Sequence, residues 1–207
     1  MTRTKQSTET NVIAMKPIGR VRNDIKPDAS PLPGTPLARS GKGWHNPASF
    51  GDAVSDVVVD QELADGLDGI EEFSHVIVYF WSGDESGKLP SGEDFSLKFR
   101  PAGLPEFPLL GVFATRCPVR PNSICATTVE IVERKGNVLR VKGLDTFDGT
   151  AVLDIKPYLP YYDSKPDARI AGWMSDLAKF FLTGQPPAYG RGILNRQMGR
   201  KDSSLIL

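Results

Sequence analysis

The stretch ICATTVEIVERKGNVLRVKG, residues 124–143, decides the fold class of this chain. Its first half is rich in β-branched and apolar residues, which favour strands. Its second half alternates apolar and basic side chains, and this period of two is typical of a strand with one buried face. The Lys-Gly-Asn sequence at 135–137 is suited to a tight turn between the halves. The stretch therefore predicts an antiparallel hairpin in a mainly β protein.

Other strands can be placed outward from this hairpin. The turn Asp148-Gly149 leads into a strand at 151–155, so three successive strands are expected to form a meander. Upstream, the same criteria predict three further strands, at 12–22 with an interruption at Pro17, at 57–59 and at 73–81. These strands would close the meander into a small closed or partly open β-barrel.

One or two short peripheral helices complete the predicted fold. The segment 61–70 suits a helical turn, and apolar residues at helical spacing predict one amphipathic helix that packs on the barrel or on a partner subunit; these residues are Trp173, Leu177, Phe180 and Phe181. We expect a disordered tail at 1–11 and a barrel domain at 12–163, in which a Pro- and Gly-rich loop at 26–51 could cover a site. A C-terminal helix and basic tail follow at 164–207.

Composition excludes several classes of protein. No apolar run approaches the roughly 20 residues that span a bilayer, and the polar N-terminus has no secretory signal, so we expect a cytoplasmic protein without a membrane partner. The two cysteines, Cys117 and Cys125, form no Cys-x-x-Cys pair, and with only two histidines they indicate neither a metal site nor a disulfide framework. Common nucleotide-loop, metalloprotease and hydrolase motifs do not occur.

Charge is segregated along the chain although the formal net charge is zero. Residues 52–94 carry twelve acidic side chains and one lysine, whereas 95–142 carry eight basic and three acidic ones. Residues 189–201 carry four basic side chains and no acidic one. Such basic stretches attract phosphate groups if the fold brings them together. The alternative, solvated faces that keep the protein soluble, stays open.

The segment ATRCPVRPN, residues 114–122, carries several side chains suited to anion binding. Its two prolines restrict the backbone, so Arg116, Arg120 and Asn122 are expected to project from a stiff loop. Guanidinium groups bind carboxylates or phosphates through two parallel hydrogen bonds. The loop therefore predicts an anion site, and the alternative is that these arginines pair with nearby acids in a structural role.

A second polar segment, KGLDTFDGTAVLDIKPYLP, spans residues 142–160. Asp154 and Lys156 are two apart on a predicted strand and therefore share a face. A carboxylate beside an ammonium group can handle a proton or hold a ribose, although an exposed ion pair of little energetic value is an alternative. His75, inside an apolar strand, is expected to be a hydrogen-bonded core residue.

Taken together, FSHVIVYFW (73–81), GVFATRCPVRPNSICATTVEI (111–131) and GLDTFDGTAVLDIKPYLP (143–160) resemble, in order and spacing, the signature blocks of one family. It is the TrmO or TsaA-like family of S-adenosylmethionine-dependent tRNA (adenine-N6)-methyltransferases, and the resemblance covers residues 17–22 and 66–163. It implies a β-barrel enzyme that acts as a homodimer and binds S-adenosylmethionine near the subunit boundary. It also implies methylation of the exocyclic N6 of threonylcarbamoyl-adenosine, just 3′ of the tRNA anticodon.

Position by position, the resemblance also implies which residues form the site. The expected cofactor contacts are Trp81, Ser82, Arg116, the backbone of Ala126, and the loop formed by Lys142, Gly143, Leu144 and Asp145. From their chemistry, we assign proton handling and substrate orientation to Asp154 and Tyr158. Substrate binding is assigned to Arg120, Asn122 and Lys156.

Three residues near the expected cofactor depart from the family motif. Cys117 stands in place of a serine, Ser123 in place of a proline, and Cys125 in place of a glycine that permits close backbone approach. Two alternatives to the tRNA reaction therefore stay open. One is methyl transfer to another nucleotide or a small molecule, and the other is a non-catalytic module that binds S-adenosylmethionine or RNA.

Overall fold

A computed structural model describes residues 13–25, 51–83 and 96–183 of the chain. The predicted tail at 1–11, nearly all of the predicted loop at 26–51 and the predicted basic tail after residue 183 lie outside the described residues.

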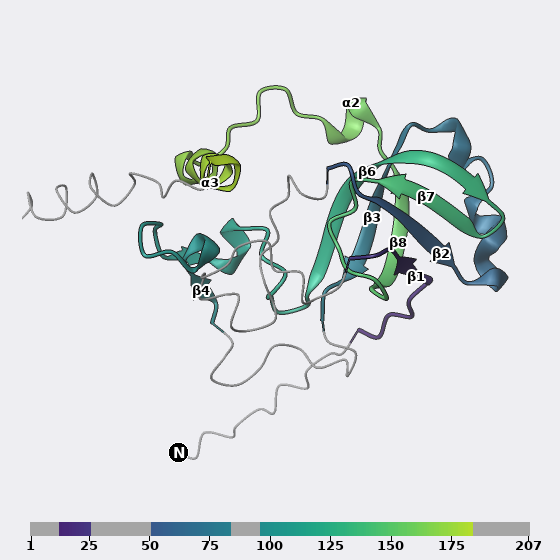
Figure 1. The fold of residues 1–207 in the computed structure, drawn as a ribbon, viewed down its shortest axis with the longest axis horizontal. Helices are drawn as coiled ribbons and strands as arrows, with labels where there is room; N and C mark the ends of the chain where they lie inside the picture. The colour runs from purple at the N-terminus through teal and green to yellow at the C-terminus, as the bar shows by residue number, and fades with distance from the viewer. Residues whose placement is uncertain (1–12, 26–50, 84–95, 184–207) are drawn as a thin grey trace, which may run out of the picture.

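Six antiparallel strands form a closed barrel in the order β1-β2-β7-β6-β3-β8 (Figure 1). Closure gives every strand of the ring a neighbour on both sides over at least part of its length. The prediction of a mainly β fold with a small barrel is confirmed. The strands are β1 (Gly19–Arg22), β2 (Val54–Val59), β3 (His75–Trp81), β6 (Ile124–Lys135), β7 (Val138–Lys142) and β8 (Ala151–Pro157).

The predicted hairpin is present as β6 and β7, joined at Gly136 and Asn137. In β7 the side chains of Leu139 and Val141 are fully buried while their basic neighbours face outward, as period-two alternation requires. The same alternation in the other strands fills the barrel interior with mostly β-branched side chains. The buried core consists of Val21, Val57, Val59, Leu67, Ile70, Val76, Val78, Phe80, Val129, Leu139, Val141, Leu144 and Val152.

The predicted three-strand meander is wrong, because β8 pairs with β3 and β1 and not with β7. The connection from β7 to β8 begins at Gly143, whose φ of 90° favours glycine. Leu144 then enters the barrel core. Asn23, which follows β1, holds the connection by donating to Thr146 O at 3.1 Å and to Asp148 Oδ1 at 3.1 Å. Because of these contacts, the connection passes β2 and β1 before the chain enters β8, on the opposite side of the barrel from β7.

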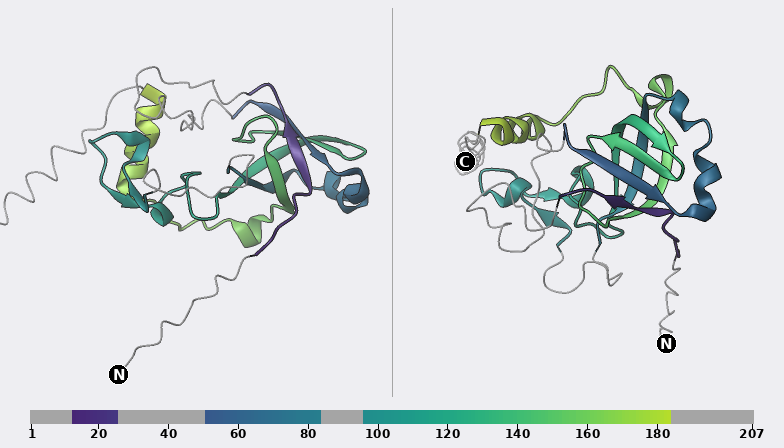
Figure 2. Two further views of the ribbon diagram at one scale, coloured as in Figure 1. Left: turned by 90° about the horizontal axis from the view of Figure 1, so that it is seen from below. Right: turned by 45° about the vertical axis from the view of Figure 1, so that its right-hand side comes forward.

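A second hydrophobic cluster lies apart from the barrel core. In α3 (Gly172–Thr183), the side chains of Trp173, Leu177 and Phe180 pack on Phe107. The helix is confirmed, but it packs on the segment that contains β4 (Lys98–Phe99) and β5 (Leu110–Gly111), and not on the barrel core. Figure 2 shows α3 beside this segment in both views.

Short helices connect the strands. The helical turn predicted at 61–70 is present as two 3₁₀ helices, η2 (Gln61–Leu67) and η3 (Ile70–Glu72). The other short helices are η4 (Pro101–Gly103), η5 (Val112–Ala114) and α2 (Pro160–Asp163). None of the helices among the described residues could span a membrane.

Two local predictions are corrected. The strand expected over 12–22 is only β1, because the chain before it makes few ladder pairs and Pro17 cannot donate a hydrogen bond. His75, expected in the core, is exposed, because β3 alternates and directs Val76, Val78 and Phe80 inward.

Candidate functional site

Lys142 pairs with Glu130, level with His75 at one end of β3, whereas Trp81, Ser82, Arg116, Ala126 and Asp145 lie toward the other end of the barrel. This end, where β3 finishes at Trp81 and β6 begins at Ile124, is here called the mouth. Residues 124–130 of β6 pair with β3, whereas β7 pairs only with the part of β6 from Glu130 onward. Among the described strands, the first half of β6 therefore has no neighbour on its β7 side. A ligand can reach backbone groups there.

Arg116 lies along this open half of β6. Its Nη2 donates a hydrogen bond to Ala126 O at 2.6 Å. Asp145, which follows β7, is close enough for its carboxylate to interact with the Arg116 guanidinium. Burial raises the pKa of Asp145, and the positive charge of Arg116 opposes that rise only in part. The arginine loop and the aspartate turn thus converge from distant parts of the sequence.

Ser82 connects the end of β3 to the arginine loop. Its hydroxyl lies 3.1 Å from both Pro118 O and Ser123 O, and Cys125 Sγ donates to it at 3.4 Å. Burial raises the pKa of the Cys125 thiol, and the charges of Arg120 and Arg116 oppose that rise. Burial therefore disfavours the thiolate form of Cys125.

Cys125 occupies the inward-facing position opposite Phe80, at the mouth. The motif comparison marks it as a departure from glycine, but no sequence signal predicts its contact with Ser82. Because the sulfur takes up space that glycine would leave open, this position narrows the mouth.

Arg120 does not project from its loop, and this part of the prediction is wrong. It is half-buried, and its Nη1 lies 3.4 Å from the carbonyl oxygens of Thr115 and Cys117. The guanidinium folds back because it can satisfy carbonyl groups that have no partner in a regular strand. Asn122 is exposed, as expected for a projecting side chain.

Ser123 adopts a φ of 48°, in the left-handed region. Its hydroxyl donates to Arg120 O at 3.1 Å. Proline, which the family motif carries at this position, holds φ near −65°. The departure at Ser123 therefore permits a loop path that a proline could not follow.

The expected cofactor loop is divided between surface and core. Lys142 forms a 2.8 Å ion pair with Asp52, and the Gly143 N–H donates to Ala53 O at 2.9 Å. The Leu144 side chain is fully buried in the core, so only its backbone is available to a ligand.

Asp154, assigned to proton handling, and Lys156, assigned to substrate binding, lie on the outer face of the barrel. Lys156 Nζ donates to Asp154 Oδ2 at 2.5 Å, as the strand spacing predicts, and lies 5.9 Å from the centre of the Tyr79 ring. Asp154 and Ala126 are both cross-strand partners of Tyr79, so they are separated by two strand spacings, roughly 10 Å. The prediction missed Tyr79, although it shares a face with Trp81 by period-two spacing.

Tyr158 lies at the opposite end of β3 from the mouth. Its ring centroid is 6.4 Å from that of His75, with the two planes at 62°. Because β3 has seven residues, His75 is roughly 20 Å from Trp81. Within one chain, Tyr158 is therefore not brought together with Arg116 and Asp145.

An open cavity of about 550 Å³ lies over β1, β2 and β7, away from the mouth, and includes Arg22, Asp56 and Arg140. Arg140 and Arg22 lower the pKa of Asp56, so the cavity wall is an internally paired ion network. No group of three or more His, Cys, Asp or Glu side chains in the described residues could hold a metal ion. The mouth therefore remains the candidate ligand site.

The raised pKa of Asp145 gives a stability prediction. A carboxyl whose folded-state pKa is raised favours folding while it is protonated, and this contribution is lost as pH rises through the folded-state pKa. Asp145→Asn stays neutral, so it should unfold at a higher urea concentration than the wild type at pH 7. The difference should shrink as pH falls from 7 and should vanish below about 4, the ordinary pKa of an aspartate in the unfolded chain. Urea unfolding across this pH range is the measurement. The exposed Asp167→Asn is the control, and parallel wild-type and Asp145→Asn profiles would contradict the prediction.

The fold and the mouth together define a small β-barrel protein with an arginine and a half-buried carboxylate at a ligand site. The profile of the family described as tRNA-methyltransferase O N-terminal domain matches residues 36–164, which is more than half of the chain. The chain belongs to this family.

Three similar proteins support this assignment. A probable S-adenosyl-L-methionine-binding protein of Pyrococcus abyssi is 42% identical over 125 residues, covering 59% of this chain and 61% of that protein. A tRNA (adenine(37)-N6)-methyltransferase of Escherichia coli is 40% identical over 118 residues, covering 54% and 47%. The crystal structure of TrmO from Pseudomonas aeruginosa has a TM-score of 0.53 and 30% identity, covering 86% of this chain and 66% of that one. The chain thus spans less than two thirds of the length of each.

Proposed function

We propose that this chain is an S-adenosylmethionine-dependent methyltransferase that methylates N6 of an adenosine in tRNA. We further propose that its target is the threonylcarbamoyl-adenosine just 3′ of the anticodon and that it acts as a homodimer in the cytoplasm. Membership of the family and the names of the relatives support the reaction class. The observation that carries the proposal is the convergence of Arg116 and Asp145 beside the open half of β6.

The chemistry of the mouth fits S-adenosylmethionine. The Arg116 guanidinium can bind the carboxylate of the cofactor. The half-buried Asp145 carboxylate can accept hydrogen bonds from the ribose hydroxyls or the amino group of the cofactor. The buried indole Nε1 of Trp81 has no hydrogen-bond partner among the described residues, and Gly83 packs against the ring. Backbone groups of Ala126, Gly143 and Leu144 can contact the adenine edge. Ser82 contacts Cys125, the residue before Ala126, and Lys142 directly precedes Gly143.

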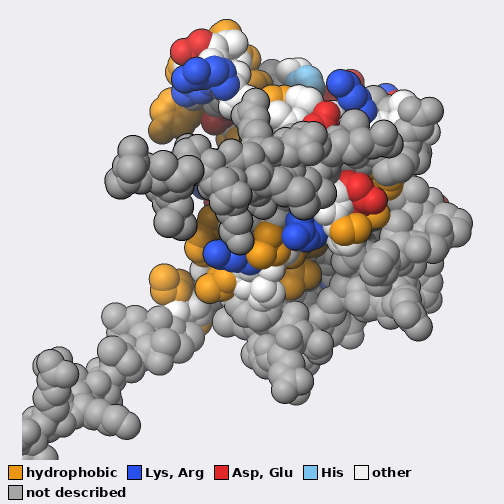
Figure 3. All heavy atoms as spheres, turned by 90° about the vertical axis from the view of Figure 1, so that its left-hand side faces the viewer, with side chains coloured by type: hydrophobic (Ala, Val, Ile, Leu, Met, Phe, Trp, Pro, Cys, Tyr) orange, Lys and Arg blue, Asp and Glu red, His pale blue; other side chains and the backbone are white. Residues whose placement is uncertain are grey.

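Seen from the α3 side, Lys and Arg side chains lie among hydrophobic ones on the surface of the molecule (Figure 3). This mixture suits a nucleic-acid substrate, whose phosphates need cations and whose bases need apolar faces.

When bound, the cofactor supplies a methyl group on a sulfonium, which is already activated for transfer. The residues of this chain then have to position the acceptor and remove its proton. Positioning alone can supply about 7–11 kcal/mol of the barrier in well-oriented reactions. Asp154 accepts the amine proton directly or through one water, and Lys156 holds its carboxylate in place. Asn122, whose side chain is exposed, helps to orient the substrate.

A second candidate function is methyl transfer to another nucleotide or to a small molecule. It is favoured by Cys125, whose side chain fills part of the mouth where the family motif carries glycine. Binding of the cofactor without salt-sensitive binding of tRNA would support this candidate over the first.

Nucleoside analysis tests the tRNA reaction. Total tRNA from a strain that lacks the gene should contain threonylcarbamoyl-adenosine without its N6-methyl form, and the methyl form should return when the full chain is supplied. The measurement is mass spectrometry of digested tRNA. Purified full chain incubated with S-adenosylmethionine should methylate tRNA that carries threonylcarbamoyl-adenosine and should leave unmodified tRNA unchanged. Identical nucleoside profiles with and without the gene would rule out this substrate.

A further inference from the structure

An exposed pair of aromatic rings follows the last barrel strand. Tyr161 is 82% exposed and Tyr162 is 72% exposed, and the two are consecutive in α2. Tyrosine is usually at least partly buried, and contiguous exposed apolar surface on a soluble domain marks an interaction site. Neither ring has a place in the cofactor site described above.

The turn that carries the two rings is held in a fixed conformation. Pro160 occupies its first position, and the Leu159 N–H donates to Asp163 Oδ2 at 2.8 Å. The N–H groups of Tyr162 and Asp163 both donate to Leu159 O at 2.8 Å. Because the backbone is already ordered, a partner that binds the rings loses little binding free energy to loop ordering.

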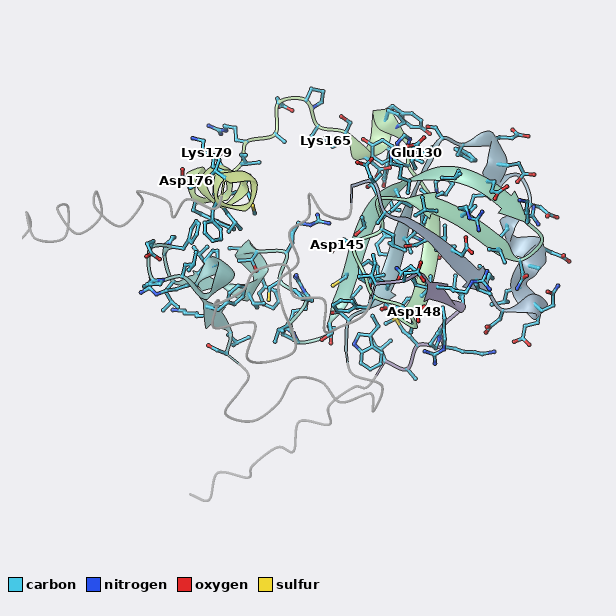
Figure 4. All side chains as sticks on the ribbon, viewed as in Figure 1. Glu130, Asp145, Asp148, Lys165, Asp176 and Lys179 are labelled. Atoms are coloured by element: carbon cyan, nitrogen blue, oxygen red, sulfur yellow. The ribbon has the colours of Figure 1, made fainter. Side chains whose placement is uncertain are left out.

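The exposed pair follows a series of aromatic and basic side chains on β3, on β8 and on the segment after β8. We call this series the tyrosine strip, and it consists of Tyr79, Lys156, Tyr158, Tyr161, Tyr162 and Lys165. Lys165 Nζ donates to Tyr162 O at 2.6 Å, and Lys156 lies against the Tyr79 ring. Figure 4 shows Lys165 on the segment that leaves the barrel toward α3, and Asp145 at the barrel edge that faces the same way.

The strip has the dimensions of a short stretch of nucleic acid. From Asp154, the proposed proton acceptor, through the end of β8 to Tyr158 of the strip, the chain extends roughly 13 Å, at about 3.3 Å per residue. Stacked bases in one strand are about 3.4 Å apart, so this span corresponds to about four stacked nucleotides.

We propose that the tyrosine strip, and Tyr161 and Tyr162 in particular, is the surface on which RNA bases that flank the target adenosine stack. The inference rests on the proposed function. An enzyme that modifies a base takes that base out of its stack, and the neighbouring bases lose a partner. Exposed aromatic rings replace the lost stacking, and they do so for any base, because every base has a π face.

Ring faces, and not net charge, carry this recognition. Residues 160–171 contain two basic and two acidic side chains. The carboxylate of Asp163 already accepts the Leu159 N–H, and Asp154 is paired with Lys156. Loss of the rings is therefore expected to weaken RNA binding without changing its dependence on salt.

The test compares two double variants of the full chain, Tyr161→Ala/Tyr162→Ala and Tyr161→Phe/Tyr162→Phe. The probe is a fluorescently labelled anticodon stem-loop RNA, and binding is measured by anisotropy at several salt concentrations. The alanine variant should bind at least tenfold more weakly with an unchanged salt slope, and the phenylalanine variant should bind within twofold of the wild type. Calorimetry with S-adenosylmethionine should give the same affinity for all three proteins, which shows that the variants are folded.

Each of the other outcomes rejects the stacking surface, the proposed function or both. Equal RNA affinity of the alanine variant and the wild type overturns the stacking surface and leaves the proposed function intact. A halved molar mass of the alanine variant in light scattering, with unchanged RNA affinity per chain, assigns the rings to a contact between two copies of this chain instead. Ring-dependent RNA binding by a wild type that transfers no methyl group keeps the surface but rejects the proposed function. A wild type that binds no RNA rejects both.

Discussion

Arg116→Ala is expected to weaken S-adenosylmethionine binding by about 100-fold. A hydrogen bond to a charged group contributes about 1.5–3 kcal/mol, and each 1.4 kcal/mol corresponds to a tenfold change in affinity. The substitution removes the guanidinium that lies beside Ala126 O and near Asp145. It also leaves the half-buried Asp145 carboxylate without an opposing charge, so the pKa of Asp145 should rise further. Calorimetric titration with the cofactor measures the loss.

Two substitutions control this experiment. Arg116→Lys keeps the positive charge but loses the planar fork, so its affinity should lie between those of the wild type and the alanine variant. Arg20→Ala removes another arginine that donates to a backbone carbonyl, Gly149 O at 3.0 Å, and cofactor affinity should not change. If Arg116→Ala binds the cofactor as tightly as the wild type, the mouth is not the cofactor site.

The sequence predicts those parts of the fold that depend on neighbouring residues. The β6–β7 hairpin is predicted because its turn and its alternation lie within twenty residues. The partner of β8 is not predicted, because it depends on contacts of Asn23 with Thr146 and Asp148, which are more than 120 positions away in the sequence. A short connection favours a meander unless such distant contacts intervene.

The predictions for the site also divide into those that depend on local spacing and those that depend on distant contacts. Asp154 and Lys156 are predicted as a pair because strand spacing alone places them together. The convergence of Arg116 with Asp145 follows from the family resemblance and from the mouth geometry, and no local pattern indicates it. Arg120 is misplaced because the carbonyl groups that bind it become available only when the loop folds. Tyr158 is placed far from the mouth by the direction of β8, which spacing within its motif does not reveal.

Gly19→Ala is expected to destabilise the fold by about 3 kcal/mol, near the upper end of the cost of overpacking. A Cβ atom at this position would lie 2.2 Å from Val58 O and 2.8 Å from Val59 Cα. These are backbone atoms of the neighbouring strand β2, so they cannot move aside as a flexible side chain could. A loss of this size is a large fraction of the roughly 5–15 kcal/mol by which a typical domain is stable.

The location of Gly19 explains why the barrel cannot absorb the strain. Gly19 pairs with Val59 of β2 on one side and with Val152 of β8 on the other. Only two residue pairs join β1 to β8 in the described barrel, and this seam closes it. Moving β1 away from β2 would therefore open the seam and expose core residues such as Val21 and Val152 to water.

Urea unfolding followed by circular dichroism measures the effect, and Gly66→Ala is the matched control. Gly66 lies in η2, where a Cβ atom would meet no heavy atom of the described residues within 4 Å, and its φ is not positive. Alanine there restricts the unfolded chain and should leave stability unchanged or slightly higher. Equal urea midpoints for Gly19→Ala and Gly66→Ala would contradict the prediction. They would mean that β1 does not lie as close to β2 as in the described barrel, and the closure of the barrel between β1 and β8 would then be wrong.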